Sequence, residues 1–99
     1  MEIIYHITTQ IEWQNAQLNG FYEAASLPIE GFIHCSKEHQ VAGVLERYFN
    51  GKNNLLKLTI DVSKLTNKLI YELAPSLNED FPHIYGFLNI DAVIKIELL

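Results

Sequence analysis

The chain has 99 residues, of which 48% are hydrophobic and 19% charged, and its formal net charge at pH 7 is −5. This composition predicts one globular domain over residues 1–99 and excludes a disordered chain. No apolar run is long enough to span a membrane, no signal-peptide pattern is present, and the single cysteine, Cys35, cannot form an internal disulfide, so we expect a cytoplasmic protein. Because Arg47 is the only arginine and basic residues do not cluster, nucleic acid is not an expected partner.

The N-terminal residues predict a strand followed by a capped helix. Residues 2–8 alternate between two faces and are rich in β-branched and aromatic side chains, which is typical of a strand. Thr9 and Glu12 have the spacing of a capping box, so we expect a helix that begins after Thr9 and runs to about Asn19. Gly20 is placed to end this helix, because glycine readily adopts the left-handed conformation found after helix C-termini.

Two residues of this helix, Trp13 and Leu18, are predicted to pack inward, and a loop is expected after the helix. Residues 21–30 contain a proline and show no period, so they predict a loop, with a short strand at residues 21–22. The loop leads into residues 31–36, where we expect the candidate site to be centred.

Residues 31–36 are predicted to form a strand with polar groups on one face. Side chains alternate in an extended segment, so Phe32, His34 and Ser36 share a face. Ser36 also stands at the N-cap position of a helix predicted over residues 37–50, so we expect the positive end of that helix near His34. Such a corner can hold an anion or a polar ligand. The predicted helix has one apolar face, formed by Val41, Val44, Leu45, Tyr48 and Phe49.

The second half of the chain is predicted to be mostly strand. Three segments have the alternating pattern of antiparallel strands: residues 55–62, 68–74 and 91–99. Residues 63–67 are expected to form a turn and residues 75–80 a polar loop. Residues 81–86 are also predicted to be a loop, whose shape is restricted by Pro82 and Gly86. This order of elements indicates an α+β domain with a curved, mostly antiparallel sheet and two main helices.

Three of the four histidines, His6, His34 and His83, are the candidate catalytic residues. Histidine exchanges protons near neutral pH and is well suited to hydrogen-bonding a ligand. His6 and His34 each lie in an apolar strand two residues before a hydroxyl, and in-register pairing of the strands would place both in one cleft. The alternative is that each is a half-buried histidine bonded to a nearby carbonyl group. His39, on the second helix, is expected to face solvent.

The candidate ligand-binding residues include two hydroxyls and one carboxylate. Thr8 and Ser36 are the hydroxyls that follow His6 and His34. Glu72, on a predicted strand, can act as a general acid or base or orient a ligand hydroxyl. The alternative for Glu72 is a solvated carboxylate on the exposed face of its strand.

His83 and Tyr85 lie in the proline-restricted loop and are predicted to form one wall of a binding site. The alternative is that the aromatic residues of this loop close the end of the sheet. Cys35 faces away from His34 by strand alternation and is expected to be a small buried residue. No close pair of metal ligands of the known spacings occurs, so no metal site is predicted.

Segments that match a known protein family occur in order along almost the whole chain: Ile4-Tyr5-His6-Ile7-Thr8, Trp13, Ser26-Leu27, Glu30-Gly31-Phe32-Ile33-His34-Cys35-Ser36, Gln40-Val41, Leu58 to Asp61, Tyr71-Glu72, Phe81-Pro82-His83-Ile84-Tyr85-Gly86, Leu88-Asn89 and Ala92-Val93. In these segments the chain resembles domain-of-unknown-function family 952, a family of small bacterial proteins. That family is in turn similar to the ADP-ribosyltransferase-like superfamily, which implies a split, curved β-sheet around a cleft for NAD.

The superfamily resemblance assigns roles to specific residues. His6 and Thr8 match a first-strand motif of Tyr-His-x-Thr type, whose histidine holds the ribose of NAD. His34 and Ser36 are similar to a second motif, in which a strand ending in serine lines the nicotinamide pocket.

Two functional hypotheses follow. In the first, the chain is an enzyme that binds NAD or a related nucleotide: His6 holds a ribose hydroxyl, His34 and Ser36 face the reacting sugar or phosphate, and His83 and Tyr85 close the pocket. In the second, the same histidine-lined cleft is a non-catalytic binding module for a small ligand or a protein. The two are distinguished by whether the imidazoles converge on one ligand position.

Overall fold

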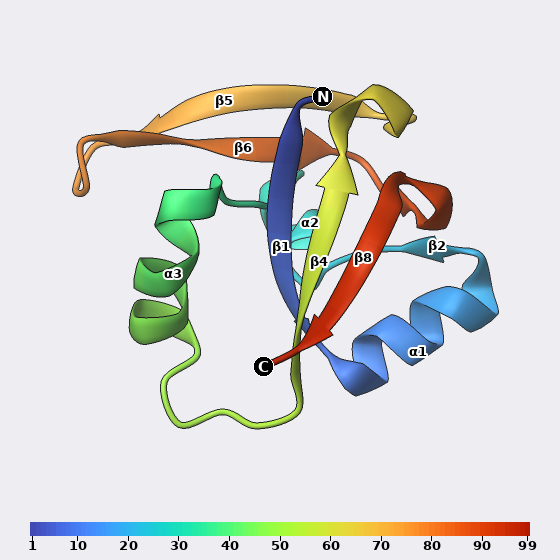
Figure 1. Cartoon of the computed structure of the whole chain (residues 1–99). Coiled ribbons are helices and arrows are strands. Elements are labelled where there is room, and N and C mark those ends of the chain that lie inside the picture. Colours follow the sequence, from blue (N-terminus) through green and yellow to red (C-terminus); the bar gives the residue numbers. More distant parts are fainter.

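Three small antiparallel sheets make up the fold of the computed structural model, which describes residues 1–99 (Figure 1). Their strand orders are β1–β4–β8, β2–β7 and β3–β6–β5. The strands are β1 (Ile3–Thr9), β2 (Phe21–Tyr22), β3 (Ile33–His34), β4 (Leu55–Asp61), β5 (Lys68–Ala74), β6 (Glu79–Tyr85), β7 (Leu88–Asn89) and β8 (Val93–Leu98). The helices are α1 (Gln10–Asn19), α2 (Leu27–Glu30) and α3 (Val41–Tyr48), with short 3-10 turns at Glu38–Gln40, Val62–Lys64 and Ile90–Ala92. The predicted α+β class is confirmed, and none of the helices is both long and apolar enough to cross a membrane.

The two three-stranded sheets are joined by one backbone bridge between Tyr5 and Ser36. The Tyr5 N–H donates to the Ser36 carbonyl at 2.8 Å, and the Ser36 N–H donates to the Tyr5 carbonyl at 2.7 Å. The bridge fixes the chain beyond β3 to the outer edge of β1. In Figure 1, β5 and β6 consequently run across one end of the β1–β4–β8 sheet.

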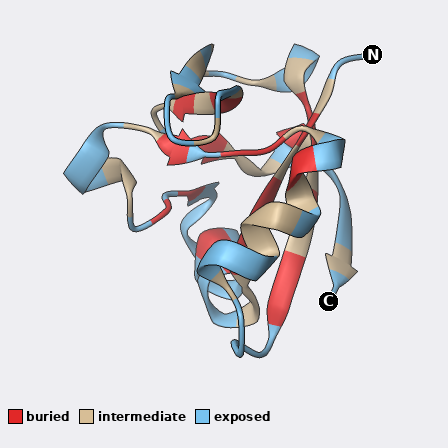
Figure 2. Cartoon of the chain, turned by 90° about the vertical axis from the view of Figure 1, so that its left-hand side faces the viewer, coloured by how far each residue is buried: buried red, intermediate tan, exposed pale blue.

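The centre of the core lies between these sheets and contains aliphatic side chains with no exposed surface. Ile4, Leu58 and Ile60 contribute from the β1–β4–β8 sheet, and Ile33 and Ile84 from the β3–β6–β5 sheet. Burying each such side chain stabilises the fold by roughly 1.5–3 kcal/mol. Figure 2 shows the buried segments gathered in the interior, with exposed residues on the outer turns of the helices.

Helix α1 begins and ends as its sequence predicts. The Glu12 N–H donates to Oγ1 of Thr9 at 3.2 Å, and the Thr9 hydroxyl donates to the Glu12 carboxylate at 2.9 Å. Gly20 closes the helix with a φ of 89°. Trp13 is buried as expected, but the prediction for Leu18 is wrong because its side chain is 86% exposed. Five residues separate the two, which places them about 140° apart around the helix.

The second helix starts later than predicted. Residues 38–40 form a 3-10 turn and α3 begins at Val41, so Ser36 is not its N-cap. The reason is local: the Ser36 backbone is held extended by its bridge to β1, and the Lys37 N–H donates to the Gln40 side chain at 2.9 Å. The predicted positive helix end beside His34 is therefore absent from the fold.

The prediction of a loop over residues 81–86 is also wrong, because Glu79–Tyr85 form β6, the central strand of its sheet. Pro82 is tolerated there because its nitrogen and carbonyl both face the side of the two-residue strand β3, where the ladder is already ending. Its carbonyl accepts from the Cys35 N–H at 2.9 Å. Gly86 ends the strand with a φ of 138°. The loop predicted over residues 21–30 likewise contains the short helix α2.

Candidate functional site

His34 and His83 face each other across the β3–β6 ladder. They are directly opposed residues in the register, and their ring centroids are 5.1 Å apart with planes at 81°. Phe32 stacks on His83, with centroids 4.0 Å apart and planes at 19°, and contacts His34 edge-on at 4.8 Å. Because the three rings pack against one another, the two imidazoles are held in a fixed relative orientation.

A carboxylate holds His83 from the neighbouring strand. Nδ1 of His83 lies 2.7 Å from Oε1 of Glu72, and the Tyr85 hydroxyl donates to the same oxygen. The hydrogen bond from Tyr85, followed by that from His83, lowers the pKa of Glu72. With Nδ1 engaged by a carboxylate, Nε2 is the nitrogen of His83 that remains for a ligand.

A second carboxylate holds His34 from the other side of the pair. Gly31, in a left-handed conformation with φ 85°, reverses the chain after α2 and brings Glu30 beside β3. Nε2 of His34 donates to Oε2 of Glu30. Nδ1 of His34 has no hydrogen-bond partner in the structure, so each imidazole presents one bonded and one free nitrogen.

A cavity of about 540 Å³ brings residues from β1, β3, α3 and the β5–β6 hairpin together. This volume lies within the range of small-molecule sites. Four of the residues singled out from the sequence line it: His6, His34, Ser36 and His83. The other lining residues are Ile7, Glu30, Cys35, Val44, Arg47, Tyr48, Phe49, Leu73, Ala74, Ser76, Leu77 and Phe81.

The sequence alone did not indicate that α3 lines this cavity. Its apolar face is not enclosed in the core: none of the residues of α3 is buried, and Tyr48 is 62% exposed. Val44 and Tyr48 instead line the cavity together with Arg47 and Phe49. Arg47 takes part in no ion pair, and its guanidinium lies 5.6 Å from the Tyr48 ring centroid. The signal in the sequence was the single arginine of the chain next to this apolar helix face.

His6 is buried, and both of its ring nitrogens are bonded within the protein. Nδ1 donates to the His34 carbonyl at 2.6 Å, and Nε2 lies 2.8 Å from the Tyr22 hydroxyl. Burial lowers the pKa of His6 to about 4, so the ring is neutral at pH 7. A neutral ring that donates from Nδ1 must accept at Nε2, so the Tyr22 hydroxyl is the donor there. This arrangement leaves no free nitrogen for a ribose hydroxyl, in contrast to the role expected from the resemblance.

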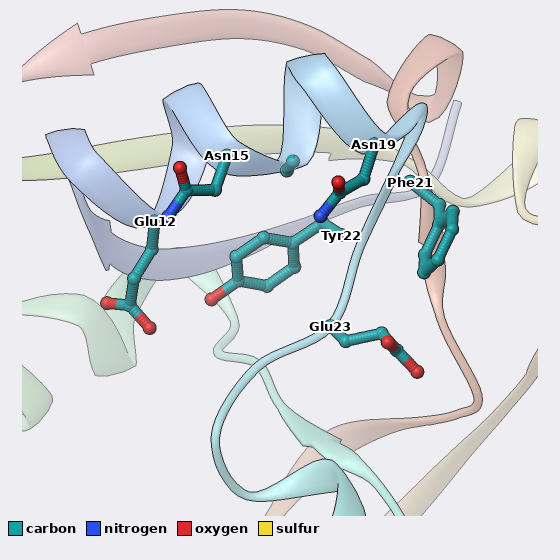
Figure 3. A pocket seen from close by; sticks show the side chains of 7 residues that line it. Glu12, Asn15, Asn19, Phe21, Tyr22 and Glu23 are labelled. Atoms are coloured by element: carbon teal, nitrogen blue, oxygen red, sulfur yellow. The ribbon is translucent and has the colours of Figure 1, made fainter.

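Thr8 continues this buried network instead of lining the cavity. Because the Tyr22 hydroxyl donates its proton to His6, the Thr8 hydroxyl donates to the Tyr22 oxygen at 3.0 Å, and a Glu12 carboxylate oxygen lies 3.4 Å from the Thr8 hydroxyl. Glu12 and Tyr22 border a smaller hollow of about 180 Å³ between α1 and the segment that follows it. Figure 3 shows Glu12, Asn15 and Asn19 on the helix side of the Tyr22 ring, with Glu23 on the other. The network therefore connects this hollow to the backbone of His34.

The remaining candidate residues lie outside the histidine pair or act through it. Glu72 is hydrogen-bonded to His83 and Tyr85 to Glu72, and neither residue lines the cavity. Burial raises the pKa of the Cys35 thiol. His39 lies away from the cavity, where its Nε2 is 3.3 Å from a Glu79 carboxylate oxygen. No group of three or more His, Cys, Asp or Glu side chains is arranged to hold a metal ion.

Residues 7–96 match the family described as "Protein of unknown function (DUF952)". The chain belongs to this family. The family prediction made from the residues is thereby confirmed, and the match includes every candidate site residue except His6. No curated protein matches the chain.

The DUF952 chain is similar to solved structures of protein CC0527 from Caulobacter crescentus. The crystal structure has a TM-score of 0.88 at 30% identity, covering 97% of this chain and 84% of that one. The solution NMR structure has a TM-score of 0.84 at 31% identity, covering 100% of this chain and 85% of that one. This chain and CC0527 therefore share one fold over nearly the whole length of this chain and most of the length of CC0527.

Proposed function

We propose that this DUF952 protein binds NAD or a related nucleotide in the 540 Å³ cavity and catalyses a reaction on it, in the manner of ADP-ribosyltransferase-like enzymes. His34 and His83 are the catalytic pair. The observation that carries the proposal is that two imidazoles 5.1 Å apart, each bonded to its own carboxylate, border one cavity. The bridged, split arrangement of two sheets beside this cavity supports the comparison with that superfamily.

The two dyads supply an acid and a base from the same side of the cavity. In a neutral His83 that donates Nδ1–H to Glu72, Nε2 has a free electron pair and can take a proton from water or a hydroxyl. His34, when its ring carries both protons, can give the Nδ1 proton to a departing group while Nε2 stays bonded to Glu30. Glu72 and Glu30 act as positioning residues: each orients its imidazole, and Glu72 also fixes the tautomer of the neutral His83.

The lining of the cavity favours a ligand with both a planar ring and a phosphate. Arg47 is a cation without a carboxylate partner, and its planar guanidinium can bind phosphate oxygens bidentately. Tyr48, Phe49 and Phe81 offer aromatic surface to a base or nicotinamide ring. Ser36 adds a hydroxyl beside the imidazoles. His6 has a positioning role here, because it holds the His34 carbonyl.

The proposal is tested by thermal-shift and NMR titrations of the protein with NAD, ADP-ribose and AMP. A ligand at 100 times its Kd stabilises the folded state by about 2.7 kcal/mol, which is readily measured. We expect saturable stabilisation by at least one of the three, weakened about tenfold or more in His34→Ala and His83→Ala. His39→Ala is the matched control, since His39 is also paired with a glutamate but lies outside the cavity.

No response of the wild-type protein to any of the three ligands would overturn the ligand class. Where binding is observed, release of nicotinamide from NAD or of base from AMP is then measured. Binding without turnover would favour the alternative of a non-catalytic small-ligand module, which the mostly apolar lining of the cavity also suits.

A further inference from the structure

We propose that β8 is a self-association surface that pairs in antiparallel fashion with β8 of a second copy of this chain. The twofold axis of the pair passes through Ile96. The two β1–β4–β8 sheets then form one continuous six-stranded sheet across the dimer. This proposal is independent of the histidine-lined cavity.

The backbone of β8 has unpaired hydrogen-bonding groups along its outer side. Strand β8 pairs only with β4 and forms the edge of its sheet, as Figure 1 shows. The Leu99 N–H donates to the Leu55 carbonyl on β4 at 3.0 Å. The backbone N–H and carbonyl groups of successive residues point to alternate sides of a strand. Because those of Leu99 point toward β4, those of Ile96 and Leu98 point away from it. An exposed strand edge of this kind is a template for pairing with another strand.

The side chains that accompany this free edge are apolar and poorly covered. Ile94, Ile96 and Leu98 are 45%, 46% and 67% exposed, although in the register Ile96 lies opposite the fully buried Leu58. The apolar face of the sheet thus continues past β4 but is left partly open at β8. Figure 2 shows this C-terminal strand as intermediate and exposed along its length. A second β8 would extend the sheet and cover these side chains.

The charges on β8 select a second copy of the same strand as the partner. With the twofold axis at Ile96, Lys95 of each copy lies directly opposite Glu97 of the other. Within one copy, Glu97 already contacts Lys95 at 2.8 Å and Lys57 at 3.0 Å. Opposite charges on facing positions of an antiparallel pair stabilise it, whereas like charges destabilise it. The same register pairs the free backbone groups of Ile96 with each other, and it places Leu98 opposite Ile94, where the β4–β8 ladder shifts register.

The first measurement is the mass in solution by analytical ultracentrifugation, from micromolar to millimolar protein. We expect a concentration-dependent rise from the monomer mass of 11.4 kDa to twice that value. Amide hydrogen exchange of the same samples locates the interface. The Ile96 and Leu98 amides gain protection as the dimer forms, while the Leu99 amide is protected at every concentration by its bond to Leu55.

Charge exchange then tests the register. Lys95→Glu places acidic side chains opposite one another across the axis, and Glu97→Lys places basic ones there, so each variant alone should dimerise about tenfold or more weakly than wild type. Mixing the two variants restores opposite charges at both positions and should restore the dimer. Glu46→Lys is the matched control, because it makes the same charge change on the exposed surface of α3. Circular dichroism of each variant checks that the fold is retained.

A monomer at millimolar concentration would overturn the proposal. So would a dimer that both single variants leave intact, because its interface must then lie elsewhere on the molecule. Failure of the mixed variants to associate, with both correctly folded, would also contradict the Ile96-centred register.

Discussion

Nδ1 of His83 lies 2.7 Å from Oε1 of Glu72, on the diagonal between β6 and β5. The same carboxylate oxygen accepts the Tyr85 hydroxyl, so one negative charge orients the imidazole and the phenol together. The hydrogen bond to Glu72, followed by desolvation and by the negative charge of that carboxylate, raises the pKa of Tyr85. Glu72 therefore determines both the tautomer of His83 and the protonation of its neighbour.

Removing the negative charge of Glu72 should change both the pKa of Tyr85 and the ligand affinity that depends on His83. In Glu72→Gln we expect the pKa of Tyr85 to fall toward its ordinary value, because the carboxylate that opposes phenol ionisation is gone. Nucleotide affinity should fall about tenfold, since His83 loses its fixed tautomer. Tyrosine titration by NMR and ligand titration measure the two effects. Glu79→Gln, which removes the partner of His39, should change neither; an unchanged Tyr85 in Glu72→Gln would contradict the geometry.

His6 should make the folded state sensitive to mild acid. Its folded-state pKa of about 4 lies below the ordinary histidine value of 6.5, so the unfolded chain takes up this proton first. The stabilisation is fully present above pH 6.5 and is lost as the pH falls toward 4. The difference corresponds to roughly 3 kcal/mol in the free energy of unfolding. Urea unfolding at a series of pH values between these limits measures the slope.

The control for this slope is His6→Asn, which keeps a donor for the His34 carbonyl but does not titrate. We expect this variant to be less stable at pH 7 and to lose most of the dependence between pH 6.5 and 4.5. If wild type and His6→Asn show the same slope, another group is responsible for the acid sensitivity.

Arg47 should discriminate ligands by their phosphate. In Arg47→Met we expect AMP to bind about tenfold more weakly while adenosine binding is unchanged, because only the phosphate loses a charge-assisted partner. Isothermal titration calorimetry with both ligands measures the difference. Lys52→Met is the control, since Lys52 is a cation near the end of α3 that does not line the cavity. Equal losses for AMP and adenosine would mean that Arg47 contributes by packing.

The capping box of α1 should contribute measurably to the stability of the fold. Thr9→Ala removes the acceptor of the Glu12 N–H and the donor to its carboxylate, and should lower the free energy of unfolding by about 1 kcal/mol. Thermal and urea unfolding measure this loss. Thr66→Ala, at an exposed threonine whose hydroxyl makes no hydrogen bond, should change stability by less than about 0.5 kcal/mol.

Local signals were sufficient to predict much of the fold. The Thr9–Glu12 spacing identified the start of α1, and alternation along residues 55–62 identified β4 with Leu58 and Ile60 buried. These features depend on residues within a few positions of one another. The prediction of Ser36 as a helix N-cap failed for the opposite reason. The conformation of Ser36 is determined by a bridge to Tyr5, thirty-one positions away in the chain.

The candidate site was only partly predictable from the sequence. Because Pro82 indicated a loop, β6 was not predicted, although this strand places His83 opposite His34. From their matching strand contexts we expected His6 and His34 to act together in one cleft, whereas in the structure the ring of His6 bonds to the backbone carbonyl of His34 and to the Tyr22 hydroxyl. Which two of three similar histidines meet depends on strand register, and register is determined by long-range pairing.

The central claim, that His34 and His83 act on one ligand, is tested most directly by long-range ¹H–¹⁵N NMR of the histidine rings during titration with ADP-ribose. We predict that the free nitrogens, Nδ1 of His34 and Nε2 of His83, shift together along one saturation curve. His39, outside the cavity, should not shift, and His6 should remain a neutral ring with its proton on Nδ1. Saturable binding that leaves the signals of His34 and His83 unchanged would contradict the claim.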